Sequence, residues 1–242
     1  LWAGALVARY QDLLDRKRRE LLRARAHSTT LRRVNSRLNR ASDAQELLQA
    51  LAEPAIEAGA TSAYLFYVDS NGEGEAEQAV VAAVWGGAGQ PLEGSTWCLR
   101  DLAFGGSLLE LDDLQLVLNV AEDQRLGEVA RELLLSSKIR TAVLIPLSRP
   151  GHWIGFIVLG WDGLHTLSEA EIEIYRALIT RASSAVENRR LLTKAREALV
   201  SVQQSEQLLQ SIIDTTPDWI FIKDRQHRFR LVNRSYAQAF HR

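Results

Sequence analysis

The chain has 242 residues, which is enough for one domain of about 150 residues and additional segments. Hydrophobic residues make up 46% of it and charged residues 24%, and its formal net charge is -1, a composition ordinary for a folded globular protein. The one cysteine, Cys98, excludes an internal disulfide and a cysteine-based zinc site. Such sparing use of cysteine fits a reducing, cytoplasmic compartment.

Basic residues concentrate near the start of the chain. From Arg9 to Arg40 there are eleven Lys and Arg residues against three acidic ones. A basic helix can contact nucleic acid or an anionic membrane, but a solvated helix face is the commoner role. No recognition motif accompanies the charge, so we expect no nucleic-acid partner.

The first ten residues, LWAGALVARY, precede arginines as the last turns of a membrane span do. An upstream connector helix is the alternative, because no run reaches the roughly 18 apolar residues of a full span. We therefore expect membrane contact only if a span lies upstream. The chain contains no methionine, and we expect it to be an excerpt of a longer protein.

Residues 5–40 contain no Gly or Pro and predict one helix, which we interpret as a connector. Its leucines recur near every seventh position, with polar interruptions, as in a coiled coil of modest quality. These leucines are Leu14, Leu21, Leu31 and Leu38.

A compact centre follows this connector. Ser42, with Gln45 three residues later, predicts the N-cap of a helix that ends at Gly59. Residues 61–69 and 78–87 predict a β-hairpin, residues 88–124 are loop-rich, and residues 125–138 predict a short amphipathic helix. Residues 140–161 predict a second hairpin with SRPGH as its turn.

A long helix is expected from Ser168, where Glu171 completes a capping box, towards Pro217, over about 45 residues. After residue 191, apolar residues alternate at spacings of three and four, and only Glu206 interrupts them. This narrow stripe is typical of a two-stranded coiled coil and predicts a homodimer. Its members are Leu192, Ala195, Leu199, Val202, Leu209 and Ile213.

Residues 139–192 resemble the second half of a GAF domain. The resemblance rests on an apolar strand ending in Pro-Leu, the run Gly-Phe-Ile-Val-Leu, a Ser-Glu-x-Glu helix start and Ala-x-x-Asn near a helix end. It extends more weakly upstream to about residue 40. It implies an α+β fold: an antiparallel sheet of about six strands with the terminal helices on one face. Loops and a short helix would cover the other face and form a pocket for a small ligand.

Residues 214–242 resemble the start of a PAS domain: PDWIFIKD as a first strand, HRFRLVN as a second and RSYAQAF as a helix capped by Asn233. We therefore expect four parts: a helical connector (1–40), a GAF domain (41–192), a coiled-coil signalling helix (193–213) and an incomplete PAS domain (214–242).

The resemblance implies a ligand pocket with an apolar wall and a few polar groups, although core packing, capping and solvation are the alternative roles. No motif identifies a ligand or cofactor. The candidate residues are Tyr64, Phe66, Trp85, Trp97, Cys98, Asp113, Arg125, Ser137, Arg140 and Thr141.

The residue pattern gives little support for bilin attachment, metal binding or catalysis. Some GAF domains bind a bilin through a cysteine followed by His, whereas Leu99 follows Cys98 here. The five histidines have no metal-ligand spacing, and no nucleophile–base pair or phosphate-binding loop can be assembled. We expect no catalytic residue and no metal site in this segment.

These features predict a sensory and signal-relay segment of a cytoplasmic or membrane-anchored signalling protein. Its output module is expected to be a histidine kinase or a diguanylate cyclase. The alternative is a dimerisation spacer whose GAF fold binds no ligand.

Overall fold

The computed structural model describes residues 17–18, 28–70, 76–87, 91–102, 104, 113–149 and 152–240. The chain divides into two compact units, Leu1–Arg189 and Arg190–Arg242. Each unit is described by itself.

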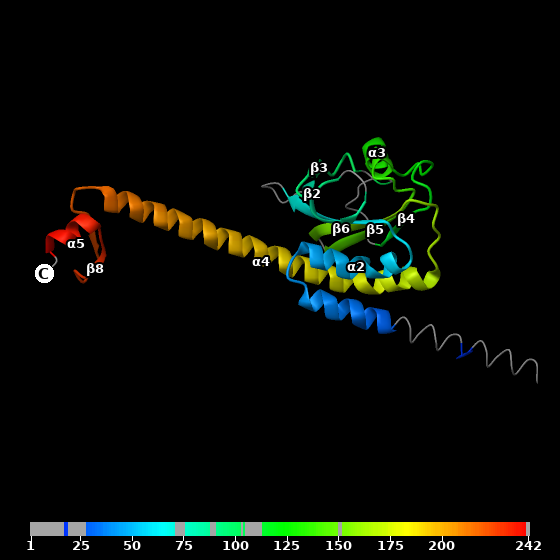
Figure 1. Ribbon diagram of the computed structural model, residues 1–242, viewed down its shortest axis with the longest axis horizontal. Helices are drawn as coiled ribbons and strands as arrows, with labels where there is room; N and C mark the ends of the chain where they lie inside the picture. Colours follow the sequence, from blue (N-terminus) through cyan, green and yellow to red (C-terminus); the bar gives the residue numbers. More distant parts are fainter. Residues whose placement is uncertain are drawn as a thin grey trace, which may run out of the picture. The chain divides into compact units, whose positions relative to one another are not determined.

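Within the described part of the first unit, one six-stranded sheet forms the centre, in the order β3-β2-β1-β6-β5-β4 (Figure 1). All of its strand pairs are antiparallel, and both predicted hairpins, β1–β2 and β5–β6, are confirmed. The strands are β1 (Ser62–Ser70), β2 (Ala76–Gly86), β3 (Thr96–Cys98), β4 (Gln115–Val117), β5 (Thr141–Arg149) and β6 (His152–Trp161).

The two edge strands lie in the stretch that the sequence presents as loop. β3 and β4 have three residues each, too short for an alternating pattern to stand out against the Gly and Pro around them. β3 pairs with the long strand β2, and β4 pairs with the long strand β5. This pairing, rather than local propensity, makes the two short segments strands.

Side chains of the central strands alternate between two apolar clusters, one on each face of the sheet. On β1, Ala63 and Leu65 join the first cluster, whereas Tyr64, Phe66 and Val68 join the second. A strand buried on both faces reads as a continuous apolar run, which is why TSAYLFYVD and TAVLIPL carry so few polar residues.

Helices cover the face of the first cluster. α2 (Ala44–Glu57) and the first half of α4 (Glu169–Thr215) lie along it, and α3 (Glu128–Ser136) lies on the opposite side of the sheet (Figure 1). Leu47 and Leu48 of α2 and Leu178 of α4 are almost completely buried there. This arrangement confirms the layers that the GAF resemblance implies.

The caps explain where these helices begin. At α4, the Glu171 carboxylate accepts from the Ser168 backbone N–H at 2.7 Å, which confirms the predicted capping box. At α2, the prediction of Ser42 as N-cap is wrong by one residue. Asp43 is the N-cap, because its carboxylate accepts from the Glu46 N–H at 2.8 Å while the Glu46 carboxylate accepts from the Ser42 N–H at 2.6 Å. A carboxylate at the helix start also benefits from the helix dipole.

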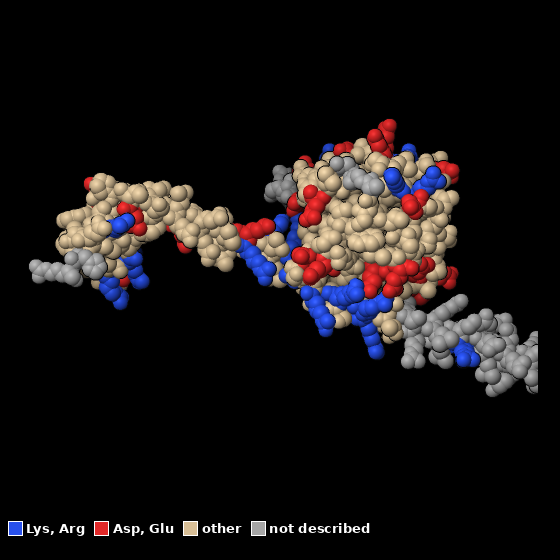
Figure 2. All heavy atoms as spheres, viewed as in Figure 1, with Lys and Arg blue, Asp and Glu red and all other residues tan. Residues whose placement is uncertain are grey.

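Residues 28–40 are helical and pack against the first cluster, where Val34 and Leu38 are buried. Arg33 forms ion pairs with Glu53 at 3.3 Å and with Glu57 at 2.7 Å, so part of the basic stretch is neutralised by α2. Figure 2 shows basic and acidic side chains side by side on this part of the unit. The predicted heptad positions Leu14 and Leu21 lie outside the described residues.

The second unit contains the end of α4 followed by β7 (Phe221–Lys223), β8 (Phe229–Val232) and α5 (Arg234–Phe240). β7 and β8 form an antiparallel pair. Asn233 is completely buried and organises the unit: its side-chain oxygen accepts from the N–H groups of Ile220 and Tyr236, both at 3.0 Å. The contact to Tyr236 confirms the predicted cap of α5.

None of the helices within the described residues is both long and apolar enough to cross a membrane.

Candidate ligand cavity

A cavity of about 60 Å³ lies between the sheet and α3, inside the second apolar cluster. Strands β1, β5 and β6 line one side of it and α3 the opposite side, and Pro91, Leu102 and Phe104 also contribute to its wall. Three of the ten candidate residues line it: Tyr64, Phe66 and Ser137.

Tyr64 and Phe66 reach the cavity because they share one face of β1. Phe66 stacks on Phe156 of β6 with the ring centroids 4.5 Å apart, and both rings are almost completely buried. The Tyr64 hydroxyl lies against Gly87, where an added Cβ would come within 2.4 Å of it. Gly87 also has a φ of +76°, so only glycine meets both requirements easily.

Trp85 lies on the opposite face of the sheet, against the helices. In a regular strand every second side chain faces the same side of the sheet. Val81 faces the cavity side, so regular alternation would place Trp85 on that side as well. A β-bulge intervenes: Leu65 pairs with Ala83 but Phe66 pairs with Val81, which leaves Ala82 as an extra residue. The extra residue reverses the alternation, and Trp85 therefore does not reach the cavity.

Trp97 and Cys98 lie on the edge strand β3. Trp97 packs half-buried against the second cluster but does not line the cavity. Cys98 is half-buried and its partner in the ladder is Gln78 of β2. Neither residue is brought to the cavity.

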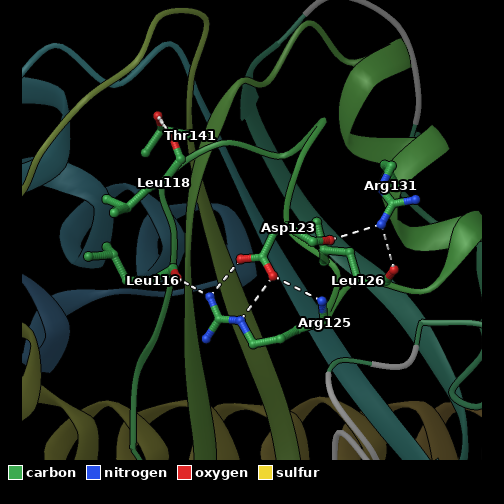
Figure 3. A network of polar contacts seen from close by, with 7 residues as sticks. All are labelled: Leu116, Leu118, Asp123, Arg125, Leu126, Arg131 and Thr141. Carbon is green, nitrogen blue, oxygen red and sulfur yellow. Dashed lines mark hydrogen bonds and ion pairs between the residues drawn. The ribbon is translucent and has the colours of Figure 1, made fainter.

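Arg125 holds the connection between β4 and α3 (Figure 3). Its guanidinium donates to the Asp123 carboxylate and, at 2.6 Å, to the Leu116 carbonyl. The hydrogen bond from Arg125 holds the pKa of Asp123 below its ordinary value, against the opposing effect of burial. The same guanidinium lies 4.6 Å from the centre of the Phe104 ring, which lines the cavity. Arg125 therefore supports the cavity wall from outside.

Thr141 and Arg131 hold the same connection. The Thr141 hydroxyl donates to the Leu118 carbonyl at 2.9 Å, and Arg131 donates to the carbonyls of Asp123 at 2.9 Å and Leu126 at 3.1 Å (Figure 3). These polar side chains satisfy the backbone carbonyls of an irregular segment that the sheet and helix ladders leave unpaired.

Of the remaining polar candidates, Ser137 and Asp113 have structural roles and Arg140 is exposed. The Ser137 hydroxyl donates to the Leu133 carbonyl at 2.9 Å at the end of α3, and the Arg140 side chain is exposed. Asp113 pairs with Arg176 of α4 at 2.6 Å, and the hydrogen bond from Arg176 holds the pKa of Asp113 below its ordinary value. Neither Asp113 nor Arg140 lines the cavity.

Several cavity residues were not among the sequence candidates, notably Phe156 of β6, Ala130 and Leu133 of α3 and Ala142 of β5. The period-two pattern of WIGFIVLGW, read against Phe66 on the neighbouring strand, would have found Phe156. No sequence signal marks the others, because an alanine that bounds a cavity looks like any core alanine.

The cavity can enclose an apolar group, and among its described lining residues Tyr64 and Ser137 alone carry a polar side-chain group, with no histidine, carboxylate or lysine beside them. The described residues also contain no cluster of three or more potential metal ligands.

Solved structures share this architecture. The chromophore-binding domain of Stigmatella aurantiaca bacteriophytochrome (Thr289His mutant) matches 67% of this chain over 60% of its own length, with 18% identity and a TM-score of 0.54. The phycocyanobilin-bound GAF domain of a cyanobacterial phytochrome matches 68% over 96%, with 17% identity and a TM-score of 0.53. The GAF domain of Acinetobacter phosphoenolpyruvate-protein phosphotransferase matches 70% over 98%, with 13% identity and a TM-score of 0.54.

The first unit has the GAF fold. At these identities the likeness concerns the fold of the GAF domain and not its ligand. Residues 207–242 match the PAS domain family, so a PAS start follows the GAF domain. No curated protein matches the chain significantly.

Proposed function

We propose that this chain is a sensory and signal-relay segment of a multi-domain signalling protein. The GAF domain binds a small molecule, and the resulting conformational change passes along α4 to the PAS start and to an output module, such as a histidine kinase or a diguanylate cyclase. GAF and PAS domains are regulatory rather than catalytic, which supports a sensory role for this segment.

The observation that carries this proposal is the continuity of α4 from the GAF core to the residues that match the PAS family. Its first turns belong to the GAF core, where Tyr175, Leu178 and Val186 are buried. The same uninterrupted helix continues to Thr215, within the residues that match the PAS family. A movement of the GAF core therefore has a continuous helix through which to act.

The exposed stripe of α4 favours a homodimer. In the single chain, Leu192 is 49% exposed, Leu199 59%, Val202 55% and Leu209 57%, although large apolar residues are normally buried. A second copy packed in parallel would bury this stripe and place two output modules side by side.

Sedimentation velocity of the purified chain tests the dimer. We expect a dimer at micromolar concentration, and we expect Leu199→Glu with Val202→Glu to weaken it at least tenfold, because two charges enter the apolar seam. Ser201→Glu with Gln204→Glu adds the same charge off the stripe and is expected to leave the dimer intact. A monomeric parent chain would contradict the proposal.

A ligand-free spacer remains the second candidate, because the cavity of about 60 Å³ is smaller than the roughly 300–1,000 Å³ of ordinary ligand pockets. The described walls of the cavity also do not enclose enough space for a ligand the size of phycocyanobilin, which a GAF domain of similar fold binds.

Disulfide formation between dimer helices separates the two candidates. In a Cys98→Ser background, cysteines are placed singly at Leu199 and at Ser201, and Ala130→Phe imitates an occupied cavity. A relay predicts that filling the cavity changes the ratio of the two cross-linking rates. A spacer predicts an unchanged ratio.

A further inference from the structure

We propose that the GAF cavity selects a small, uncharged, apolar ligand of a few heavy atoms. This inference rests on the proposed sensory function and names the chemical class of the ligand. Three properties of the cavity carry it: its volume, the engagement of the neighbouring charges and the apolar character of its walls.

The volume sets an upper limit on the ligand. Apolar cavities of about 150 Å³ in proteins stay dry and bind benzene or xenon. At about 60 Å³, this cavity has less than half of that volume, and its walls include the stacked rings of Phe66 and Phe156. A xenon atom or a molecule smaller than benzene fits within the described walls, and a nucleotide would extend beyond them.

The nearby cations donate to groups of the protein itself, although the Nε of Arg131 is buried without a hydrogen-bond partner. Arg125 donates to the Asp123 carboxylate and to the Leu116 carbonyl. Arg131 donates to the carbonyls of Asp123 and Leu126. Neither guanidinium is part of the cavity lining, so an anion entering the cavity would lose its hydration without gaining a countercharge.

The two hydroxyls in the lining offer little to a polar ligand. The Ser137 hydroxyl donates to the Leu133 carbonyl of its own helix. The Tyr64 hydroxyl lies against the backbone at Gly87. The other lining residues of β1, β5, β6 and α3 are apolar, so hydrophobic transfer and dispersion contacts are the main sources of affinity.

NMR of the chain carrying ¹³C-labelled alanine methyl groups, recorded under xenon pressure, tests the proposal. Ala130 and Ala142 line the cavity, whereas Ala52 and Ala55 are buried on the opposite face of the sheet and serve as internal controls. We expect saturable shifts at Ala130 and Ala142 and no more than general pressure effects at Ala52 and Ala55. Equal or absent shifts at all four methyl groups would overturn the proposal.

Two variants on α3 check the location. Ala130→Phe fills the cavity and is expected to reduce the xenon shifts at Ala142 at least tenfold. Val129→Phe adds the same ring at the neighbouring, 37% exposed position and is expected to leave them unchanged. If Ala130→Phe does not fold, the comparison of the four methyl groups in the parent chain still tests whether xenon binds in the cavity.

Other probes test size and charge. We expect benzene, inorganic phosphate and a cyclic nucleotide to cause no saturable shift at Ala130 and Ala142. Benzene binding as tight as that of xenon would refute the size limit, and binding of either anion would refute the charge argument. Xenon binding does not require a dimer or a relay. A positive xenon result with an unchanged cross-linking ratio would therefore keep the ligand class and reject the relay.

Discussion

At the scale of single residues, glycine controls how closely the central strands approach. Gly155 lies in β6, opposite Tyr67 of β1. A Cβ added at Gly155 would come within 2.0 Å of the Phe66 carbonyl oxygen, so the strand beneath the cavity admits no side chain at this position. The apolar run that resembles GAF sequences begins with this glycine for a steric reason.

Gly155→Ala is expected to destabilise the GAF domain by about 1–3 kcal/mol, the usual cost of overpacking. Urea denaturation measures this free energy of unfolding. Gly163→Ala is the matched control, because an added Cβ there meets no atom within 4 Å and the effect should stay within about 0.5 kcal/mol. Equal stability of the two variants would mean that the strands separate without cost.

At the scale of elements, polar side chains fix the irregular segment between β4 and α3. Arg125, Arg131 and Thr141 together donate to four different backbone carbonyls. Arg125 and Thr141 were candidates for polar contacts to a ligand, and in the structure both bind the protein's own backbone. A short edge strand such as β4 needs this help, since it has only one partner strand among the described residues.

Arg125→Gln is expected to lower stability by about 1 kcal/mol near pH 7, a value kept small because the arginine is 45% exposed. The pKa of Asp123 is lowered in the folded state, so its contribution is fully present above the ordinary value of 3.8 and is lost as the pH falls through the folded value. The difference between parent and variant should therefore shrink below pH 3.8.

Urea denaturation at pH 7 and at successively lower pH values checks this dependence. Arg140→Gln removes an exposed charge outside the network and serves as the control. A parent–variant difference that does not change with pH would show that Arg125 acts through its bond to Leu116 and not through Asp123.

At the scale of the whole molecule, the two units have different internal support. The GAF domain has two apolar clusters, one on each face of its sheet. In the second unit, the aromatic residues Trp219, Phe221 and Phe240 are about half exposed, and Asn233 is the one fully buried side chain among the unit's described residues. Its side-chain amide donates to the carbonyls of Ile213 and Asp218 at 3.1 and 2.8 Å.

Asn233→Ala is therefore expected to weaken the second unit by about 2 kcal/mol or more, because buried backbone groups lose their partners. Hydrogen exchange should accelerate roughly 30-fold at the amides of Ile220 and Tyr236, which corresponds to that free energy. Amides of β1 and β6 should keep their rates. Gln238→Ala, an exposed change in α5, is the control, and acceleration throughout the GAF domain would contradict the separation of the two units.

The sequence by itself determined most of the elements and their order: both hairpins, the capping box of α4, the length of that helix and the Asn233 cap, but not the short edge strands β3 and β4. These features depend on contacts between residues close in the chain and on periodicity, which a sequence displays directly. The GAF resemblance added the sheet and its layers.

Only the tertiary structure decided which residues meet at the cavity. The bulge at Ala82 turned Trp85 to the helical face, and a bulge depends on how two strands pair rather than on either strand alone. The candidate residues Arg125, Ser137 and Thr141 bind backbone carbonyls whose positions are fixed by the folded chain. The volume of the cavity depends on how β1, β5, β6 and α3 pack together, and no local pattern in the sequence encodes the packing of elements that lie far apart in the chain.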